Sequence, residues 1–153
     1  MKKMIETKIL NPMLGRDFEL PKHATSGSAG LDIRACIETA ITLEPGDSKI
    51  IGSGLAININ DPSVMAVLVA RSGLGVKHGI IISQAVGVID SDYHGEILVA
   101  LWNRSQESFV VNPGERICQM LFVPVIQSEL VIVDEFSNTT DRGAGGFGST
   151  GRN

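Results

Sequence analysis

Short apolar runs alternate with clusters of turn-forming residues along most of the chain. The apolar runs are rich in Val and Ile, and they read SKIIGSGLAINI, SVMAVLVA, HGIIISQAVGVI, EILVALWN, SFVVNP, RICQMLFVPVI and ELVIVDEF. The segments between them, EPGD, NDPS, RSGLG, DSDYHG and NPGE, contain the Gly, Pro, Asn and Asp that tight turns need. Numerous short strands of this kind predict an all-β domain, built as an antiparallel sandwich, a jelly roll or a small barrel. At most one helical turn is expected, in SGLGVKHG.

Length, charge and cysteine content narrow the class of protein. A chain of 153 residues suits one domain that buries a core without disulfides or structural metals. Cys36 and Cys118 match no zinc or CxxC spacing, which favours two reduced thiols. The formal net charge of −4 argues against a protein that grips nucleic acid through its phosphates. With no secretory signal and no apolar run long enough for a membrane helix, a soluble cytoplasmic protein is predicted.

The C-terminal segment TDRGAGGFGSTGRN combines many glycines with one aromatic ring. A plain disordered tail gains nothing from Phe147, so we expect residues 137–153 to form an arm that closes over a ligand, following a β domain over residues 1–136. Arg142, Ser149 and Thr150 are suited to a polyphosphate. No strand precedes the glycines and no Walker lysine follows them, so the segment matches neither nucleotide fingerprint. A flexible end with a stray Phe is the alternative.

A second polar cluster follows the strand predicted over SVMAVLVA. Arg71, Ser72 and Gly73 place a guanidinium, a hydroxyl and a permissive backbone together at a strand end, and such groups bind phosphate oxygens. Alone, an Arg-Ser-Gly turn is more often an ordinary surface loop. The combination with the C-terminal cluster favours a polyphosphate site.

Carboxylates interrupt the apolar pattern at two places. In GVIDSDYHGE, Asp90 and Asp92 stand at the end of a predicted strand with Tyr93 beside them, so one of them could orient a water for attack. The alternative is a hairpin loop whose acids cap their own backbone. Asp32, in SAGLDIRA, is either a buried hydrogen-bonded acid or an outer-sphere partner of a metal's waters.

Five segments in order, AGLDIRA, ARSGLG, GVIDSDYHGE, GERICQMLF and RGAGGFGST, resemble the five motifs of the trimeric deoxyuridine triphosphate nucleotidohydrolases, the dUTPases. The resemblance covers nearly the whole chain. It implies a jelly-roll-like β fold of the bacterial dUTPase type and the hydrolysis of dUTP to dUMP and pyrophosphate. That reaction limits uracil incorporation into DNA and supplies dUMP for thymidylate synthesis.

The resemblance also implies roles for individual residues. Arg71 and Ser72 would hold phosphate oxygens, with the serine near the α-phosphate. Asp90 would activate the attacking water, and Tyr93 would pack on the deoxyribose so that a 2′-hydroxyl clashes. Gln119 would bind the phosphate chain through its side-chain amide.

The remaining motifs imply a lid and a metal. Arg142, Phe147, Ser149 and Thr150 would close over the γ-phosphate and the uracil, in a site shared between the subunits of a homotrimer. Asp32 would sit near waters bound to Mg²⁺, which hard oxygen ligands and phosphates favour. The cofactor expected is therefore Mg²⁺.

One position departs from the bacterial pattern. Where close relatives carry Gly-Asn in the hairpin before the third motif, this chain has Ser83-Gln84. Gln84 is one methylene longer than Asn, so its amide either reaches the uracil edge or points away. Much of the uracil reading in the family uses hairpin backbone groups, which a side-chain change leaves intact.

Two other functions fit the same residues less well. A dCTP deaminase on a related fold would release ammonia. A non-catalytic nucleotide-sensing module would tolerate the loss of Asp90, so the presence of that residue counts against it.

Overall fold

The computed structural model describes residues 3–146 of the chain, and in this part of the chain strands dominate. The elements are β1 (Glu6–Ile9), β2 (Leu31–Arg34), β3 (Ile41–Leu43), β4 (Ser48–Gly52), β5 (Leu55–Asn58), β6 (Val64–Ala70), α1 (Ser72–Lys77), β7 (Ile80–Ile82), β8 (Gly87–Ile89), β9 (Leu98–Asn103), β10 (Phe109–Val111) and β11 (Arg116–Pro124). The prediction of an all-β domain is confirmed, and the short helix lies in the segment where a helical turn was expected.

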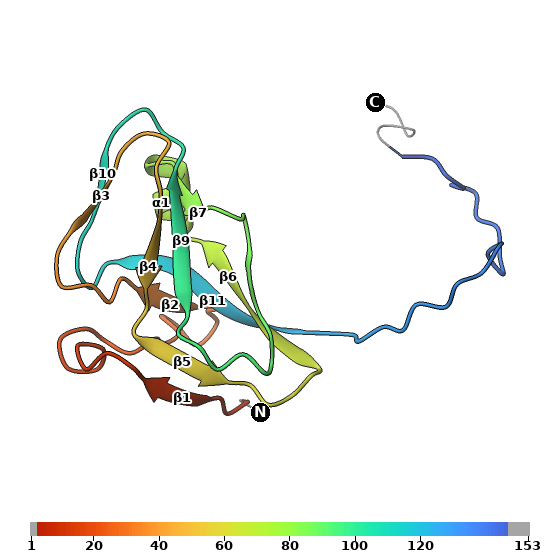
Figure 1. The fold of residues 1–153 in the computed structure, drawn as a ribbon, viewed down its shortest axis with the longest axis horizontal. Coiled ribbons are helices and arrows are strands. Elements are labelled where there is room, and N and C mark those ends of the chain that lie inside the picture. The colour runs from red at the N-terminus through yellow and green to blue at the C-terminus, as the bar shows by residue number, and fades with distance from the viewer. Residues whose placement is uncertain (1–2, 147–153) are drawn as a thin grey trace.

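Antiparallel pairing joins the strands into four small sheets that form a jelly-roll-like body (Figure 1). The largest has the order β2-β11-β6-β8, the next β4-β9-β7, and two pairs, β1-β5 and β3-β10, complete the set. Strands far apart in sequence lie side by side in each sheet. This arrangement brings residues of β2, β6 and β11 together on one sheet face.

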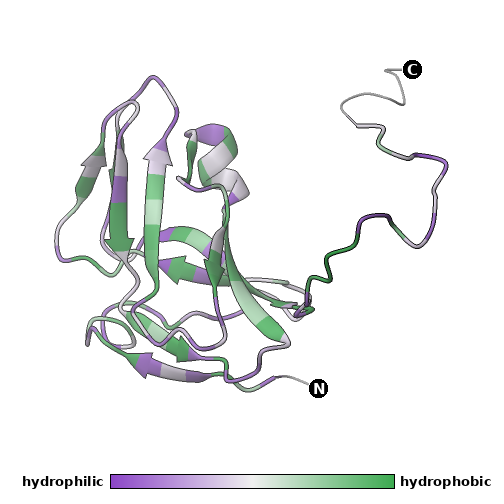
Figure 2. Ribbon diagram, turned by 45° about the vertical axis from the view of Figure 1, so that its right-hand side comes forward, coloured by the Kyte–Doolittle hydropathy of each residue, from purple (hydrophilic) through white to green (hydrophobic). Residues whose placement is uncertain are grey.

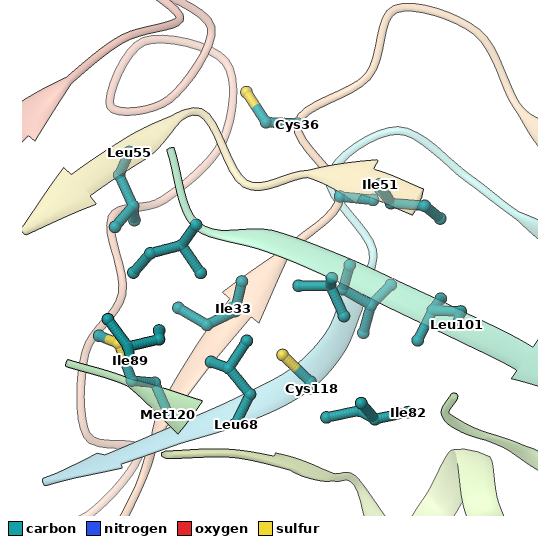
Figure 3. Packing of buried hydrophobic residues seen from close by; sticks show 14 of the residues in the cluster. Ile33, Cys36, Ile51, Leu55, Leu68, Ile82, Ile89, Leu101, Cys118 and Met120 are labelled. Carbon is teal, nitrogen blue, oxygen red and sulfur yellow. The ribbon is translucent and has the colours of Figure 1, made fainter. Parts of the chain in front are cut away.

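The inward side chains of these sheets meet in one apolar core (Figure 3). Ile33 of β2, Leu68 of β6 and Leu101 of β9 are at most 2% exposed. Strand β9 alternates buried Val99 and Leu101 with outward Leu98 and Trp102, as a strand with one buried face requires. Fully burying one such aliphatic side chain stabilises the fold by about 1.5–3 kcal/mol, so the core supplies the main favourable term.

Two of the predicted turns, EPGD and NPGE, form where the sequence places them. In EPGD the N–H of Asp47 donates to the carbonyl of Glu44 over 2.9 Å, and Gly46 takes a φ of 87°. In NPGE the N–H of Glu115 donates to the carbonyl of Asn112 over 3.1 Å, and Gly114 takes a φ of 74°. Side chains other than glycine rarely adopt these positive φ values, which explains both glycines.

The run ELVIVDEF does not form the strand that was predicted for it. After β11 ends at Pro124, the N–H of Val125 donates to the carbonyl of Ser63, and the chain then leaves the body as an extended segment (Figure 1). Leu130, Ile132 and Phe136 are each at least 88% exposed, and they form part of an apolar stretch of this segment (Figure 2). A strand needs a partner for its backbone groups, and within the described part of this one protomer the run has none.

Two sequence-based expectations about the class of protein can be compared with the described residues. Cys36 and Cys118 are both free, as predicted, and both are buried. Across residues 3–146 the structure contains no helix whose length and hydropathy would let it cross a membrane.

Candidate functional site

A polar cluster covers the outward face of the sheet β2-β11-β6. Asp32 of β2 pairs in register with Gln119 of β11, and Gln119 pairs on its other side with Val69 of β6. Residues directly opposite in a sheet share a face, and so do residues two apart on one strand. Arg71 continues the extended backbone of β6, with φ −81° and ψ 132°, and therefore lies on the same face as Asp32 and Gln119.

A β-bulge in β11 adds Arg116 to this face. Between Arg116 and Cys118 the pairing with β2 advances by two residues on β11 but by one on β2, so Ile117 is the extra residue. Ile117 and Cys118 both point into the core, with exposures of 2% and 0%. In a regular strand Arg116 and Gln119, three apart, would face opposite sides, whereas the bulge places both on the outer face.

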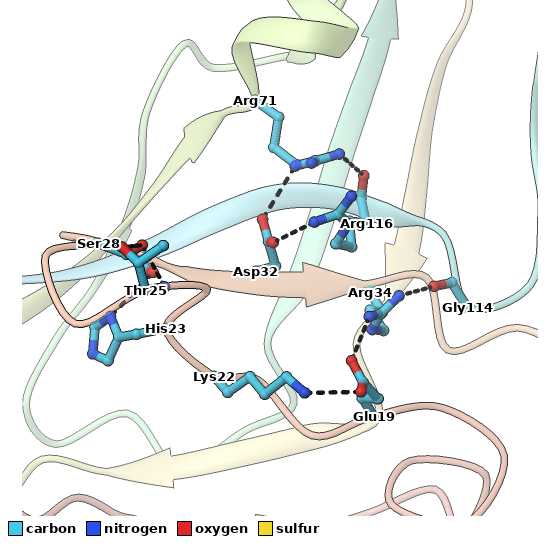
Figure 4. Close-up of polar contacts among 11 residues, drawn as sticks. Glu19, Lys22, His23, Thr25, Ser28, Asp32, Arg34, Arg71, Gly114 and Arg116 are labelled. Atoms are coloured by element: carbon cyan, nitrogen blue, oxygen red, sulfur yellow. Dashed lines mark hydrogen bonds and ion pairs between the residues drawn. The ribbon is translucent and has the colours of Figure 1, made fainter.

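Asp32 is held between two arginines (Figure 4). Nη1 of Arg116 donates to Oδ2 of Asp32 over 3.1 Å, and Nε of Arg71 lies 3.1 Å from Oδ1. The Arg71 N–H does not point at that oxygen, so the contact is an ion pair without a hydrogen bond, and Oδ1 is a buried oxygen with no hydrogen-bond partner in the described structure. Nη1 of Arg71 donates instead to the backbone carbonyl of Arg116 over 3.1 Å. The cluster thus contains two guanidinium groups and one carboxylate.

The core side of the same strands holds Cys118. Burial and, to a smaller extent, the charge of Asp32 raise the pKa of the Cys118 thiol to about 12, with Arg71 partly offsetting both effects. A thiol with this pKa stays protonated and unreactive at neutral pH. Cys118 therefore packs beneath the cluster as an inert side chain.

Ser72 and Gly73 begin α1 directly after Arg71. Both residues are exposed, and the N-terminus of the helix has no side-chain cap. A Cβ added at Gly73 would meet no heavy atom within 4 Å, so packing within the protomer does not explain the glycine. The position is open to a ligand or to a neighbouring chain.

A separate small cavity of about 180 Å³ lies beside the turn between β7 and β8. Gln84, Asp90 and Tyr93 all line it, together with Leu68, Val88 and Glu96. The turn is tight: the N–H of Ala85 donates to the carbonyl of Ile82 over 3.0 Å, and Ala85 takes a φ of 68°. The structure therefore brings together the side chains that were predicted to bind the nucleoside and to activate water.

Tyr93 is fixed at the wall of this cavity. Its hydroxyl donates to the backbone carbonyl of Glu96 over 3.0 Å, and its N–H donates to the carbonyl of Asp90 over 3.2 Å. A Cβ at Gly95 would overlap the Tyr93 hydroxyl, so glycine at this position lets the ring lie against the chain. The ring remains 44% exposed and presents a free surface.

Asp90 also lines a wider hollow of about 740 Å³ on its other side. Asp61, Asp92 and His94 line the same hollow. No group of three or more His, Cys, Asp or Glu side chains within residues 3–146 is placed to hold a metal ion. A cage made only of protein ligands is therefore not present in this part of the chain.

The two halves of the predicted site lie apart within one protomer. Ile89 of β8 pairs with Ala66 of β6, so Asp90, which follows Ile89, lies near Met65. Arg71 follows six residues after Met65 along the same strand direction, which corresponds to about 20 Å at the strand rise of about 3.3 Å per residue. The phosphate-type cluster and the Asp90 cavity therefore do not form one site in a single chain.

Of the predicted lid residues, Arg142 lies within the described chain, in the extended segment after β11. Nε of Arg142 donates to the carbonyl of Gly145 over 3.0 Å, within a turn of the extended segment. Phe147, Ser149 and Thr150 lie outside the described residues.

Two residues of the site were missed by sequence reasoning. Arg116 stands in GERICQMLF, but its spacing of three from Gln119 indicates the opposite face of a strand, and the bulge is not visible in the sequence. Glu96 stands at the end of GVIDSDYHGE, and its contribution is a backbone carbonyl, which residue identity does not indicate.

Comparison with known proteins identifies the family. The dUTPase family model matches residues 16–151. The chain is 57% identical over 150 residues to the deoxyuridine 5′-triphosphate nucleotidohydrolase of Shigella sonnei (strain Ss046), covering 98% of this chain and 99% of that protein. The chain belongs to the dUTPase family. The predicted resemblance and fold class are thereby confirmed.

Solved dUTPase structures agree with this assignment. The dUTPase of Staphylococcus bacteriophage 80alpha with dUPNHPP matches with a TM-score of 0.86 and 26% identity, covering 98% of this chain and 99% of that chain. The G164S mutant of the same phage dUTPase with dUpNHpp gives a TM-score of 0.85 at 25% identity, covering 98% and 99%. This dUTPase family member thus shares the fold of these solved family structures.

Proposed function

We propose that the protein hydrolyses dUTP to dUMP and pyrophosphate in a site assembled from more than one copy of the chain. The observation that carries the proposal is the pairing of a carboxylate-bearing cavity, with Asp90 and Tyr93, and an arginine-rich face, with Arg71, in a dUTPase family member. The relation to a phage dUTPase that binds dUPNHPP supports a ligand of this chemistry.

The small cavity would take the nucleoside. Its volume of about 180 Å³ suits a pyrimidine and part of a sugar rather than a whole triphosphate. The exposed face of Tyr93 is available to the deoxyribose, and the turn that carries Gln84 would offer backbone groups to the base edge. Gln84 lines this cavity, which supports an amide contact with uracil.

The outer sheet face would take the phosphates. Nη2 of Arg71 has no hydrogen-bond partner among the described residues, so its N–H groups can donate to phosphate oxygens. Ser72 and Gly73 are exposed next to it, and Gln119 lies on the same face. Charge on the triphosphate must be neutralised before water can attack, and these donors supply part of that neutralisation.

The residues present fit a magnesium ion that is held mainly by substrate. Mg²⁺ commonly keeps several waters and binds substrate phosphates with few protein ligands. Asp32 supplies a carboxylate oxygen, Oδ1, that is free of hydrogen bonds, and it therefore can accept from metal-bound water. When bound, the ion would polarise the phosphate oxygens and spread the charge that develops during hydrolysis.

Asp90 would act as the base. A carboxylate within hydrogen-bond reach of a water can take its proton as the oxygen attacks the α-phosphorus in line, and pyrophosphate then leaves. The oxygens of the α-phosphate would be held by Arg71 and Ser72. Because these groups lie about 20 Å from Asp90 along β6 in one protomer, the proposal needs Arg71 from a neighbouring copy.

Self-association is supported by the surface of the sheet β4-β9-β7. Ile50, Leu98 and Trp102 lie on its outward side with exposures of 68%, 48% and 38%. The extended apolar segment after Pro124 also lacks a partner within the described protomer. A homotrimer that covers these surfaces, as in trimeric dUTPases, is part of the proposal, as is a cytoplasmic location, with which the two free thiols agree.

The arm would close the site of a neighbour. Residues 137–153 carry Arg142, Phe147, Ser149 and Thr150, whose chemistry suits a γ-phosphate and a flat base. Deleting residues 140–153 is expected to leave a folded protein that hydrolyses dUTP poorly. Full activity of the truncated protein would refute the lid.

The experiment that tests the function measures two products. Wild-type protein is incubated with Mg²⁺ and dUTP, dTTP, dCTP or UTP, and pyrophosphate and ammonia are quantified while light scattering gives the mass in solution. Pyrophosphate from dUTP alone, without ammonia, from a species of three chains is the expected result. Ammonia from dCTP would indicate a deaminase, and binding without either product would indicate a sensing module.

A further inference from the structure

Arg116 contacts both other charged members of the outer-face cluster. Its guanidinium donates to Oδ2 of Asp32, and its backbone carbonyl accepts from Nη1 of Arg71. Figure 4 shows Arg116 beside both residues, on β11, which lies between β2 and β6 in the sheet. We propose that Arg116 is a positioning residue, which keeps Asp32 and Arg71 from closing into a bidentate pair so that Arg71 stays available to phosphate. The inference rests on the proposed function of this face.

Without Arg116, Arg71 and Asp32 would adopt a different pairing geometry. An arginine and a carboxylate prefer a bidentate fork with two parallel N–H to O bonds. Arg71 and Asp32 do not form this fork: only Nε approaches Oδ1, its N–H points elsewhere, and Nη1 donates to the Arg116 carbonyl. Arg116 prevents the fork because it occupies Oδ2 with its side chain and Nη1 of Arg71 with its backbone.

The position of Arg116 is fixed by the bulge. Ile117, the extra residue of β11, is buried and anchors the backbone next to Arg116. The Arg116 side chain is 46% exposed, while those of Asp32 and Arg71 are 16% and 23% exposed. The guanidinium of Arg116 thus contacts the less exposed carboxylate of Asp32 from the solvent side.

Removal of the Arg116 side chain would free Oδ2. The carboxylate of Asp32 could then rotate and form the fork with Arg71, and two donors of Arg71 would be lost to the phosphates. The metal-facing oxygen of Asp32 would be engaged at the same time. Weaker binding of the magnesium nucleotide is therefore expected, with little effect on the nucleoside cavity.

The test measures binding rather than turnover alone. Calorimetry gives the affinity for dUpNHpp, the non-hydrolysable imido analogue of dUTP, over a series of Mg²⁺ concentrations. Arg116→Gln is expected to weaken binding about 10-fold, the usual effect of one charge-assisted hydrogen bond, and Arg116→Lys to recover most of it. Arg34→Gln is the matched control, because Arg34 lies opposite Arg116 in register and pairs with Glu19 instead.

A double-mutant comparison separates positioning from direct phosphate binding. If Arg116 acts through Asp32, the Arg116→Gln change has little further effect on dUpNHpp affinity in an Asp32→Asn background. Equal losses in both backgrounds would show that Arg116 binds phosphate itself and would overturn the inference. Wild-type affinity in Arg116→Gln would overturn it as well.

Stability and activity readouts keep the outcomes distinct. Thermal unfolding monitored by circular dichroism is recorded for each variant. If neither Arg116→Gln nor Arg116→Lys folds, Arg116 is a structural residue and the inference fails. If wild-type protein releases no pyrophosphate from dUTP, the proposed function fails, whereas an active wild type with an unchanged Arg116→Gln refutes only the positioning role.

Discussion

The hydroxyl of Tyr93 donates a 3.0 Å hydrogen bond to the backbone carbonyl of Glu96. The carboxylate of Glu96 in turn accepts a 2.8 Å bond from the N–H of Gly54, in the turn between β4 and β5. The aromatic wall of the nucleoside cavity is therefore tied to two different sheets. A ring held in this way can exclude a larger sugar, because it cannot move aside at low cost.

Tyr93→Phe is expected to weaken sugar discrimination. The ring remains but loses one neutral hydrogen bond, worth about 1 kcal/mol, so the ratio of kcat/KM for dUTP over UTP should fall about fivefold. Steady-state kinetics with both nucleotides measure the ratio. An unchanged ratio would mean that the hydroxyl does not orient the ring.

Asp90→Asn is expected to fold and bind but to turn over slowly. Asn keeps the size of the side chain and loses the ability to take a proton, and general-base assistance is typically worth about 10²- to 10⁴-fold. Pyrophosphate release from dUTP measures the loss, and calorimetry with dUpNHpp checks that binding is retained. Normal turnover by Asp90→Asn would contradict the assignment of Asp90 as the base.

Mixed oligomers test whether the site is shared between copies. Arg71→Ala and Asp90→Asn proteins are each expected to be nearly inactive. After mixing, unfolding and refolding together, about one quarter of the sites would join an intact Arg71 to an intact Asp90 from another chain, so about a quarter of wild-type activity should return. A mixture as inactive as its components would indicate that each site lies within one chain.

The buried thiols predict a loss of stability at alkaline pH. The pKa of Cys118 is raised by burial to about 12, whereas a thiol in an unfolded chain titrates near 8.5. Above about pH 8.5 the unfolded chain binds fewer protons than the folded chain, so the free energy of unfolding falls by up to about 1.4 kcal/mol per pH unit until the folded thiol also ionises.

Urea unfolding between pH 8 and 10.5 measures this slope. Cys118→Ala removes the titrating group and serves as the comparison, since other groups that ionise in this range are shared by both proteins. The free energy of unfolding should fall more steeply with rising pH in the wild type than in Cys118→Ala. Parallel slopes would mean that Cys118 ionises equally in both states.

The all-β class and most strands could be predicted because each relies on a local pattern. Val99 and Leu101 alternate with outward residues in β9, and the glycines of EPGD and NPGE stand where positive φ is needed. The placement of Gln84, Asp90 and Tyr93 around one cavity also involves only a short stretch of chain, in which the three residues lie within ten positions of one another. Features that depend on residues close together in the chain can be predicted from the sequence.

The incorrect and missed predictions have a common physical cause: each feature depends on how the segment pairs with another strand. ELVIVDEF has high β propensity but no strand beside it in the described protomer, so its backbone groups face solvent. Arg116 was overlooked because the alternation rule assigns it to the wrong face unless the two-for-one pairing at Ile117 is known. The distance between Arg71 and Asp90 likewise depends on the register of β6 with β8, which no single segment encodes.

The bulge at Ile117 makes the length of β11 more important than its composition. A substitution there changes how well one side chain fills the core, but deleting the residue would shift Arg116 by one place and turn its side chain to the opposite face of the sheet. Natural or engineered variants of this segment should therefore carry substitutions and not deletions. The loops at either end of the strand can accept insertions.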